Sequence, residues 1–104
     1  MATFFRNEVV KNVGTTPVKV IETNGATRAT VIGLSFTNLT DKFVYVNVEL
    51  QSQDSARGFY LKDSILPSGT SLRAVSSGEK LILATSNAMY VSATLDDSVD
   101  VIIS

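Results

Sequence analysis

The densest group of side chains that could do chemistry is a set of three acids, Asp96, Asp97 and Asp100. Two carboxylates that hydrolyse a glycosidic bond must face each other across the substrate, at a separation of about 5 to 10 Å. Adjacent acids at a hairpin tip instead point apart into solvent. The same oxygens could hold Ca²⁺, but the sequence lacks an Asp-x-Asp-x-Asp-Gly spacing. We interpret the three acids as a solvated turn and predict no catalytic residues and no metal site.

The rest of the sequence lacks the side chains on which most catalysis near neutral pH depends. No His, Cys or Trp occurs in the 104 residues, so the common catalytic triads and dyads cannot be built. Gly33, Gly58, Gly69 and Gly78 lie in separate segments and form no phosphate-binding loop. A glycosylation sequon at 38–40 matches a pattern that is common by chance, and we assign no glycan to it. We predict no enzymatic activity and no cofactor.

Charge and length narrow the class of protein further. Nine Lys and Arg residues balance ten Asp and Glu residues, and no segment concentrates either sign. Duplex nucleic acids and membrane surfaces attract a basic patch, so we predict that neither is a partner. Residues 1–8 lack the pattern of a signal peptide, and no stretch reaches the roughly 20 apolar residues of a membrane span. The length suits one domain over residues 1–104, without a linker.

Alternation of apolar and polar residues is the main structural signal. It is clearest over 43–51, where Val44, Val46 and Val48 share one face. A second alternating run over 30–38 precedes it, and the polar residues between the two are typical of a turn. We expect these two runs to form an antiparallel hairpin. Further strand signals follow at short intervals over residues 9–13, 17–22, 59–62, 71–75, 80–85, 88–95 and 99–104.

About nine short strands, with turns roughly every 8 to 12 residues, predict an all-β fold rather than βαβ units. The expected architecture is a single antiparallel β-sandwich, Ig-like or jelly-roll-like, in which Asn24-Gly25 closes a tight turn through a positive φ. Phe59 and Leu61 are placed at one end of the core. The remaining predicted core residues are Ile32, Leu34, Phe36, Val44, Val46, Val48, Leu72, Leu81, Leu83, Met89, Val91, Val99 and Val101.

Several apolar residues are candidates for a subunit interface. Phe4 and Phe5 are adjacent, so both cannot face one core; residues 1–7 are either an N-terminal arm on a neighbouring subunit or an early first strand. The last strand is apolar on both faces around Ile102, so it is either central in a sheet or covered by another subunit. The predicted subunit-interface residues are Phe4, Phe5, Tyr45, Tyr60 and Ile102.

The aromatic residues leave three alternatives open. Tyr45, Tyr60 and Tyr90, with Phe43 and Phe59, can pack at the ends of the sheets, contact a subunit or line a ligand site. A strip formed by the three tyrosines would suit a monomeric ligand- or carbohydrate-binding β-module. Sequence alternation does not choose among these alternatives.

The order of certain segments resembles that in small accessory virion proteins of tailed bacteriophages. These are Ala-Thr-Val-Ile-Gly-Leu-Ser-Phe-Thr-Asn at 29–38, Ile-Leu-Pro-Ser-Gly-Thr-Ser-Leu at 65–72, Gly-Glu-Lys-Leu-Ile-Leu-Ala at 78–84 and Ser-Val-Asp-Val-Ile-Ile-Ser at 98–104. The resemblance implies a non-enzymatic structural subunit located in the virion. It would self-assemble and pack on the capsid as a decoration protein or at the neck or tail. Its expected partners are other virion proteins and further copies of itself.

Overall fold

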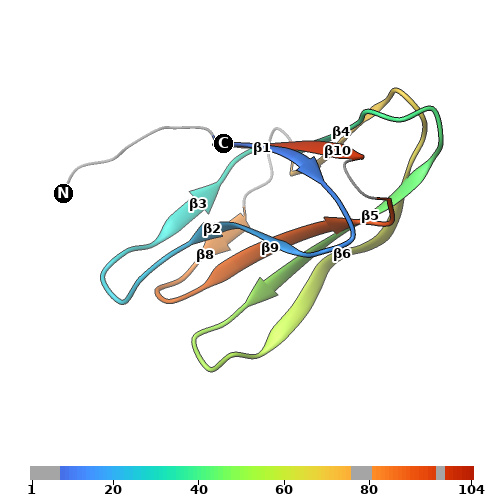
Figure 1. Cartoon of the computed structure of the whole chain (residues 1–104). Helices are drawn as coiled ribbons and strands as arrows, with labels where there is room; N and C mark the ends of the chain where they lie inside the picture. The colour runs from blue at the N-terminus through green and yellow to red at the C-terminus, as the bar shows by residue number, and fades with distance from the viewer. Residues whose placement is uncertain (1–7, 76–80, 96–97) are drawn as a thin grey trace.

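The all-β prediction is confirmed by the computed structural model, which describes residues 8–75, 81–95 and 98–104 (Figure 1). The described residues form ten strands, because the strand expected over 30–38 is broken in two, and they contain no helix. The strands are β1 (Glu8–Val13), β2 (Val18–Glu22), β3 (Ala29–Val31), β4 (Leu34–Asn38), β5 (Val44–Gln51), β6 (Arg57–Leu66), β7 (Ser71–Val75), β8 (Leu81–Leu83), β9 (Ala88–Ala93) and β10 (Val99–Ile103).

The strands pair in a nested order. β5 pairs with β6, β4 with β7, β3 with β8, β2 with β9 and β1 with β10, and every pair is antiparallel. The two halves of the chain therefore form one long antiparallel hairpin, which is folded over to give two sheets. Two more antiparallel pairings, β4 with β10 and β5 with β9, assemble the sheets. With β3 and β8 set aside, this is the eight-strand, two-sheet order of a jelly roll.

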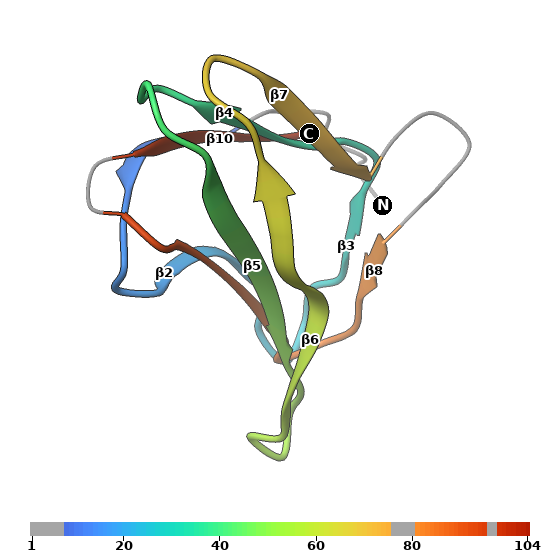
Figure 2. The same cartoon turned by 90° about the vertical axis from the view of Figure 1, so that its right-hand side faces the viewer.

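Two four-stranded sheets and one small sheet result. Sheet A has the order β1-β10-β4-β7, sheet B has the order β2-β9-β5-β6, and β3 pairs with β8 alone. Figure 2 shows β10, β4 and β7 across the top, β5 and β6 below them, and β3 and β8 along one side. The core contains predicted residues and also members that were not predicted: Val13, Val20, Val31, Leu66, Ala88, Ala93 and Ile103.

The last strand is central in its sheet, because β10 lies between β1 and β4. Val99, Val101 and Ile103 point into the core and are buried. Ile102 points to the outer face, where it is exposed and lies opposite Val9 of β1. The last strand is therefore apolar on both faces because its inner face is buried in the core and Ile102 is exposed on its outer face.

The break between β3 and β4 corrects one core prediction. At Ile32 and Gly33 the chain passes from the small sheet to sheet A, so the alternation changes phase. Val31 and Leu34 are three residues apart and both are buried, while Ile32 between them is exposed. The prediction of Ile32 in the core is wrong, because it extended one alternation across the switch between sheets.

The expected hairpin between 30–38 and 43–51 is also wrong. β4 belongs to sheet A and β5 to sheet B, so the connection between them crosses from one sheet to the other. The polar residues correctly marked a change of direction. They could not identify the partners of the two strands, because alternation specifies faces and leaves pairing open.

The turn expected at Asn24-Gly25 is present, but its conformation differs from the prediction. Gly25 has no positive φ. Instead, the Asn24 side-chain oxygen accepts hydrogen bonds from the Ala26 N–H at 2.8 Å and the Thr27 hydroxyl at 3.1 Å. The turn is closed by the amide side chain, a mechanism typical of Asn.

The prediction of Phe59 in the core is also wrong, because β6 contains bulges. Register shifts on both sides of the Val48–Leu61 pair interrupt the alternation of this edge strand. Phe59 is consequently 51% exposed, so its placement in the core is wrong. Leu61, Leu72 and Leu81 are partly buried and pack against the core cluster.

Candidate functional site

The acidic residues do not form a site within the described residues. The Asp100 carboxylate accepts a hydrogen bond from the Asn12 N–H at 3.0 Å, so it stabilises the bend at the end of β1. Asp96 and Asp97 lie outside the described residues. Across 8–75, 81–95 and 98–104, no three His, Cys, Asp or Glu side chains converge as metal ligands. Of the three acids, the one that the structure describes therefore makes a structural contact.

The predicted interface residues lie in separate places. Tyr45 is exposed on the outer face of sheet B, and Ile102 is exposed on the outer face of sheet A. Tyr60, on the edge strand β6, donates its hydroxyl to the Ala74 carbonyl of β7 at 3.4 Å. Phe4 and Phe5 lie outside the described residues. The structure thus places the three described candidates on three different surfaces.

Tyr45 belongs to a larger apolar group, which we call the end cluster. Its members are Phe43, Tyr45, Ile65, Pro67 and Leu95. The rings of Phe43 and Tyr45 meet edge to face, with centroids 5.8 Å apart and an interplanar angle of 83°. Ile65 lies directly opposite Tyr45 in the β5–β6 pair. Phe43 is 58% exposed, and Ile65 and Leu95 are exposed as well.

The end cluster surrounds an open hollow. Phe43, Tyr45, Pro67 and Leu95 supply its apolar walls. The polar residues around these walls are Asp41, Lys42, Ser68 and Thr94. The hollow is thus an apolar surface with one acid and one base, adjacent in sequence, at its rim. Such a composition fits an apolar side chain of a protein partner better than a polar small molecule.

Buried Asn38 fixes the backbone beneath the end cluster. Its side-chain N–H groups donate to the carbonyls of Lys42 at 2.8 Å and Leu66 at 2.9 Å. Its side-chain oxygen accepts from the backbone and the hydroxyl of Thr40, both at 2.8 Å. The β4–β5 connection and the end of β6 are therefore held together. Asn38 is only 2% exposed, so the sequon does not present a free amide for glycosylation in this fold.

The Leu95 side of the end cluster is also anchored. The Tyr45 N–H donates to the Thr94 hydroxyl at 3.0 Å, and the Thr94 N–H donates to the Tyr45 carbonyl at 3.1 Å. The Ser98 hydroxyl donates to the Leu95 carbonyl at 2.6 Å. The end cluster thus rests on the β4–β5 and β6–β7 connections, which lie at one end of the molecule (Figure 1), and on Thr94 and Leu95, which follow β9.

The sequence predicted only part of the end cluster. Tyr45 was a candidate for the interface, and Phe43 was among the aromatic residues with an open role. Ile65, Pro67 and Leu95 were missed, because they come from segments far apart in the chain. The available signal was local: each is an apolar residue beside a turn, where burial in the subunit's own core is hardest to achieve.

The three tyrosines do not form one strip. The Arg57 guanidinium lies 4.0 Å from the centroid of the Tyr90 ring, and its Nη2 lies 2.8 Å from the Glu49 carboxylate. One face of Tyr90 is therefore covered by a cation. Tyr45 is four residues from Glu49 along β5, or about 13 Å away. Tyr60 turns toward β7, so the described geometry does not support the aromatic sugar-binding strip.

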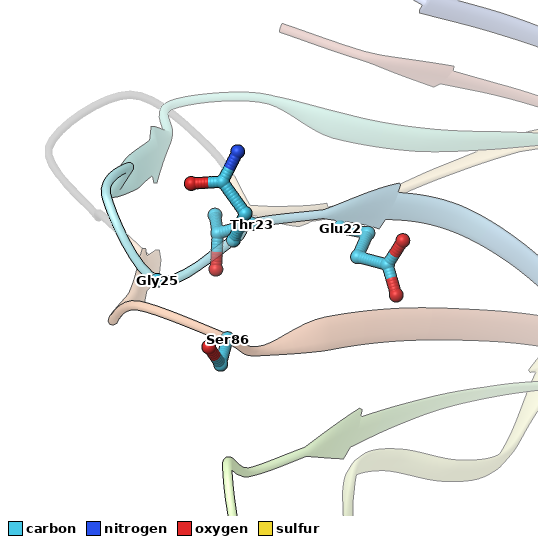
Figure 3. A pocket seen from close by; sticks show the side chains of 5 residues that line it. Glu22, Thr23, Gly25 and Ser86 are labelled. Atoms are coloured by element: carbon cyan, nitrogen blue, oxygen red, sulfur yellow. The ribbon is translucent and has the colours of Figure 1, made fainter.

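A polar hollow at the opposite end lies between two turns (Figure 3). It is lined by Glu22, Thr23, Asn24, Gly25 and Ser86. The Thr23 hydroxyl donates to the Ala84 carbonyl at 2.5 Å and accepts from the Asn87 N–H at 2.9 Å. The Ser86 N–H donates to the Asn24 carbonyl at 3.0 Å. These polar groups join the β2–β3 and β8–β9 turns to each other.

Glu22, at the edge of the polar hollow, is already paired. Its carboxylate lies 2.9 Å from the Lys19 ammonium, and both side chains are exposed. The hydrogen bond to Glu22, helped by its charge, raises the pKa of Lys19 above the ordinary value. The hollow therefore presents no unpaired acid, and we interpret it as a structural junction.

No family model, curated protein or solved structure matches this chain. In the described part of the chain, no helix has the length and apolar character needed to cross a membrane. The fold and surface define an all-β jelly roll with an exposed apolar end cluster.

Proposed function

We propose that this chain is a non-enzymatic structural subunit of a tailed-phage virion. It associates with copies of itself and with other virion proteins at the capsid, neck or tail. The observation that carries association is the end cluster, which exposes Phe43, Tyr45, Ile65 and Leu95 together. Contiguous exposed apolar patches that are rimmed by polar residues commonly mark interaction surfaces.

The virion setting rests on the resemblance of the sequence segments described above. The jelly roll agrees with it, since this architecture occurs in viral capsid proteins, although it also occurs in lectins. The surface favours a structural subunit over a lectin-like module. One face of Tyr90 is covered by Arg57, whereas the apolar walls of the end cluster remain exposed.

Quantitative mass spectrometry of purified particles from the source tests this proposal. We expect the protein to be present at a fixed copy number relative to the major capsid protein. A ratio near that of the capsid subunit indicates shell decoration, and a small ring-like number indicates the neck or tail. Absence from the particles would contradict the proposal and favour the ligand-binding module.

A further inference from the structure

We infer that the end cluster is a two-fold interface between two copies of this chain. The inference deepens the proposed function and rests on its premise that copies associate. It adds the surface, the partner and the symmetry. In a two-fold interface the same patch is used on both subunits, so the patch must complement itself in shape and in charge.

The end cluster has a shape that can complement itself. Phe43 is 58% exposed, more than Tyr45, Ile65 or Leu95, and the hollow beside it is lined by Tyr45, Pro67 and Leu95. A two-fold axis beside Phe43 sets each Phe43 ring into the hollow of the other copy. Each subunit then supplies one projecting ring and one receiving hollow, and both apolar surfaces leave water.

The charges at the rim also complement themselves. Asp41 and Lys42 are adjacent and both are exposed, and neither forms an ion pair with another described residue. A two-fold axis between them pairs Asp41 of one copy with Lys42 of the other, twice in one interface. A partner surface with charge of a single sign would instead oppose one of the two residues. Complementary rim charges of this kind select the partner and its orientation.

The backbone that carries these groups is fixed before any partner arrives. Asn38 holds the carbonyls of Lys42 and Leu66, and the Ser68 hydroxyl donates to the Thr40 carbonyl at 3.0 Å. Little ordering of the connections is then needed on association, which lowers its entropic cost. The polar network beneath the end cluster therefore serves the interface as well as the fold.

Other exposed apolar residues offer less. Ile82 on β8 is 67% exposed, but it lies opposite Thr30 rather than in an apolar group. Val9 and Ile102 form a pair on sheet A, and neither lines one of the two hollows described above. The bulges in β6 interrupt the edge of sheet B and discourage strand addition there. Among the described surfaces, shape and charge complementarity coincide at the end cluster.

The end cluster has five members, fewer than the roughly 20 to 30 residues that each partner contributes to a standard interface. We therefore expect a reversible dimer rather than a permanent one. Sedimentation velocity of the full chain, from micromolar to near-millimolar concentration, measures the dissociation constant directly.

Four variants and one control test the inference. Phe43→Ser removes the projecting ring from an exposed position, so we expect a folded monomer with an unchanged circular dichroism spectrum. Asp41→Lys and Lys42→Asp each create like-charge contacts across the axis, and each should weaken the dimer by about tenfold. The double variant D41K/K42D reverses both charges and should restore dimerisation. The control is Ile82→Ser, which removes a more exposed apolar side chain elsewhere and should leave the dimer intact.

Several outcomes would overturn the inference. A wild-type chain that stays monomeric throughout the concentration range has no such interface. The inference also fails if Phe43→Ser dimerises as the wild type does, if Ile82→Ser is equally damaging, or if D41K/K42D does not recover association. A dimer that ignores every end-cluster variant removes this surface and leaves the proposed function standing. Absence from particles together with an intact, Phe43-dependent dimer contradicts the proposed function and leaves the interface standing.

Discussion

Gly33 and Ser104 exchange two backbone hydrogen bonds. The Ser104 N–H donates to the Gly33 carbonyl at 2.9 Å, and the Gly33 N–H donates to the Ser104 carbonyl at 3.3 Å. The same Ser104 carbonyl accepts a bond from the Ile32 N–H at 2.9 Å. Residue 104 thus follows β10 and stabilises the point where the chain leaves the small sheet for sheet A.

Deletion of Ser104 should therefore lower the free energy of unfolding by roughly 1–3 kcal/mol, because three backbone hydrogen bonds lose a partner. Urea denaturation, monitored by circular dichroism, measures the change in the free energy of unfolding. Gly33→Ala is a milder control: a Cβ there would lie 3.2 Å from the Ser104 hydroxyl, and that side chain can rotate away. We expect Gly33→Ala to cost less than about 1 kcal/mol. A deletion as mild as this control would show that the junction contributes little.

Val46→Asp should unfold the protein. Val46 on β5 is 0% exposed, so the variant buries an unpaired carboxylate in the apolar core. Its neighbour Asn47 lies on the outer face and accepts a hydrogen bond from the Asp63 N–H at 2.8 Å. Asn47→Asp keeps that acceptor at the surface and should remain folded. Thermal melting of both proteins checks the assignment of faces, which a folded Val46→Asp variant would refute.

The sequence predicted the strands well where one alternation covers one element. Val44, Val46 and Val48 are all fully buried, as the alternation over 43–51 requires. The bend at Pro67–Gly69 likewise follows from local residue types, since Gly69 adopts a φ of 65° and the Thr70 N–H donates to the Pro67 carbonyl. Local chemistry determined these features, because alternation and turn geometry require no knowledge of distant partners.

Prediction failed where tertiary pairing changed the local rule. Ile32 is exposed, contrary to the prediction, because the chain switches sheets beside it. Phe59 is exposed because β6 has bulges. The nested pairing places β4 and β5 in opposite sheets, which alternation cannot indicate. The end cluster shows the same limit for the site. Tyr45 and Leu95 are 50 positions apart, and reciprocal bonding between Tyr45 and Thr94 brings them together.

Asn38→Asp should destabilise the protein by roughly 3 kcal/mol at neutral pH. The introduced carboxylate cannot donate to the Lys42 and Leu66 carbonyls, and burial penalises its charge. Burial and these carbonyls raise the pKa of the introduced group above its unfolded value. The variant's stability should therefore be greatest below the unfolded pKa and fall as the pH rises through the folded pKa.

Urea denaturation of Asn38→Asp at several pH values tests this sign. Asn38→Ala, which introduces no charge, is the matched control and should lose about 1–3 kcal/mol without the added pH dependence. If the two variants respond alike to pH, the Asn38 side chain does not occupy the buried site described for it.

Asp54, in the loop between β5 and β6, has a shifted pKa that can be measured. Ser52 donates its hydroxyl to the Asp54 carboxylate, and this hydrogen bond is the main cause that lowers the pKa of Asp54 below its ordinary value. The Ala56 N–H contributes a weaker bond at 3.4 Å. Because the folded pKa is depressed, the stabilisation is present above the unfolded pKa. It is lost as the pH falls through the folded pKa.

NMR titration of the Asp54 side chain should show the lowered pKa directly. Ser52→Ala should move the pKa back toward the ordinary value. Thr70→Ala, in a separate turn whose hydroxyl bonds the Pro67 carbonyl, is a control that should leave Asp54 unchanged. An Asp54 pKa that is identical in the wild type and Ser52→Ala would contradict the assigned cause.

Deletion of residues 1–6 separates the two interpretations of Phe4 and Phe5, which lie outside the described residues. If these residues contact a neighbouring subunit, the deletion should impair assembly and leave the melting temperature of the isolated subunit nearly unchanged, because no contact within the subunit is lost. If they belong to the subunit's own core, both should fall together. Sedimentation measures assembly and calorimetry measures melting.

Because the end cluster supplies its own interface, we expect the deletion to preserve the Phe43-dependent dimer while removing higher assembly. Equal losses of melting temperature and assembly would refute the N-terminal arm.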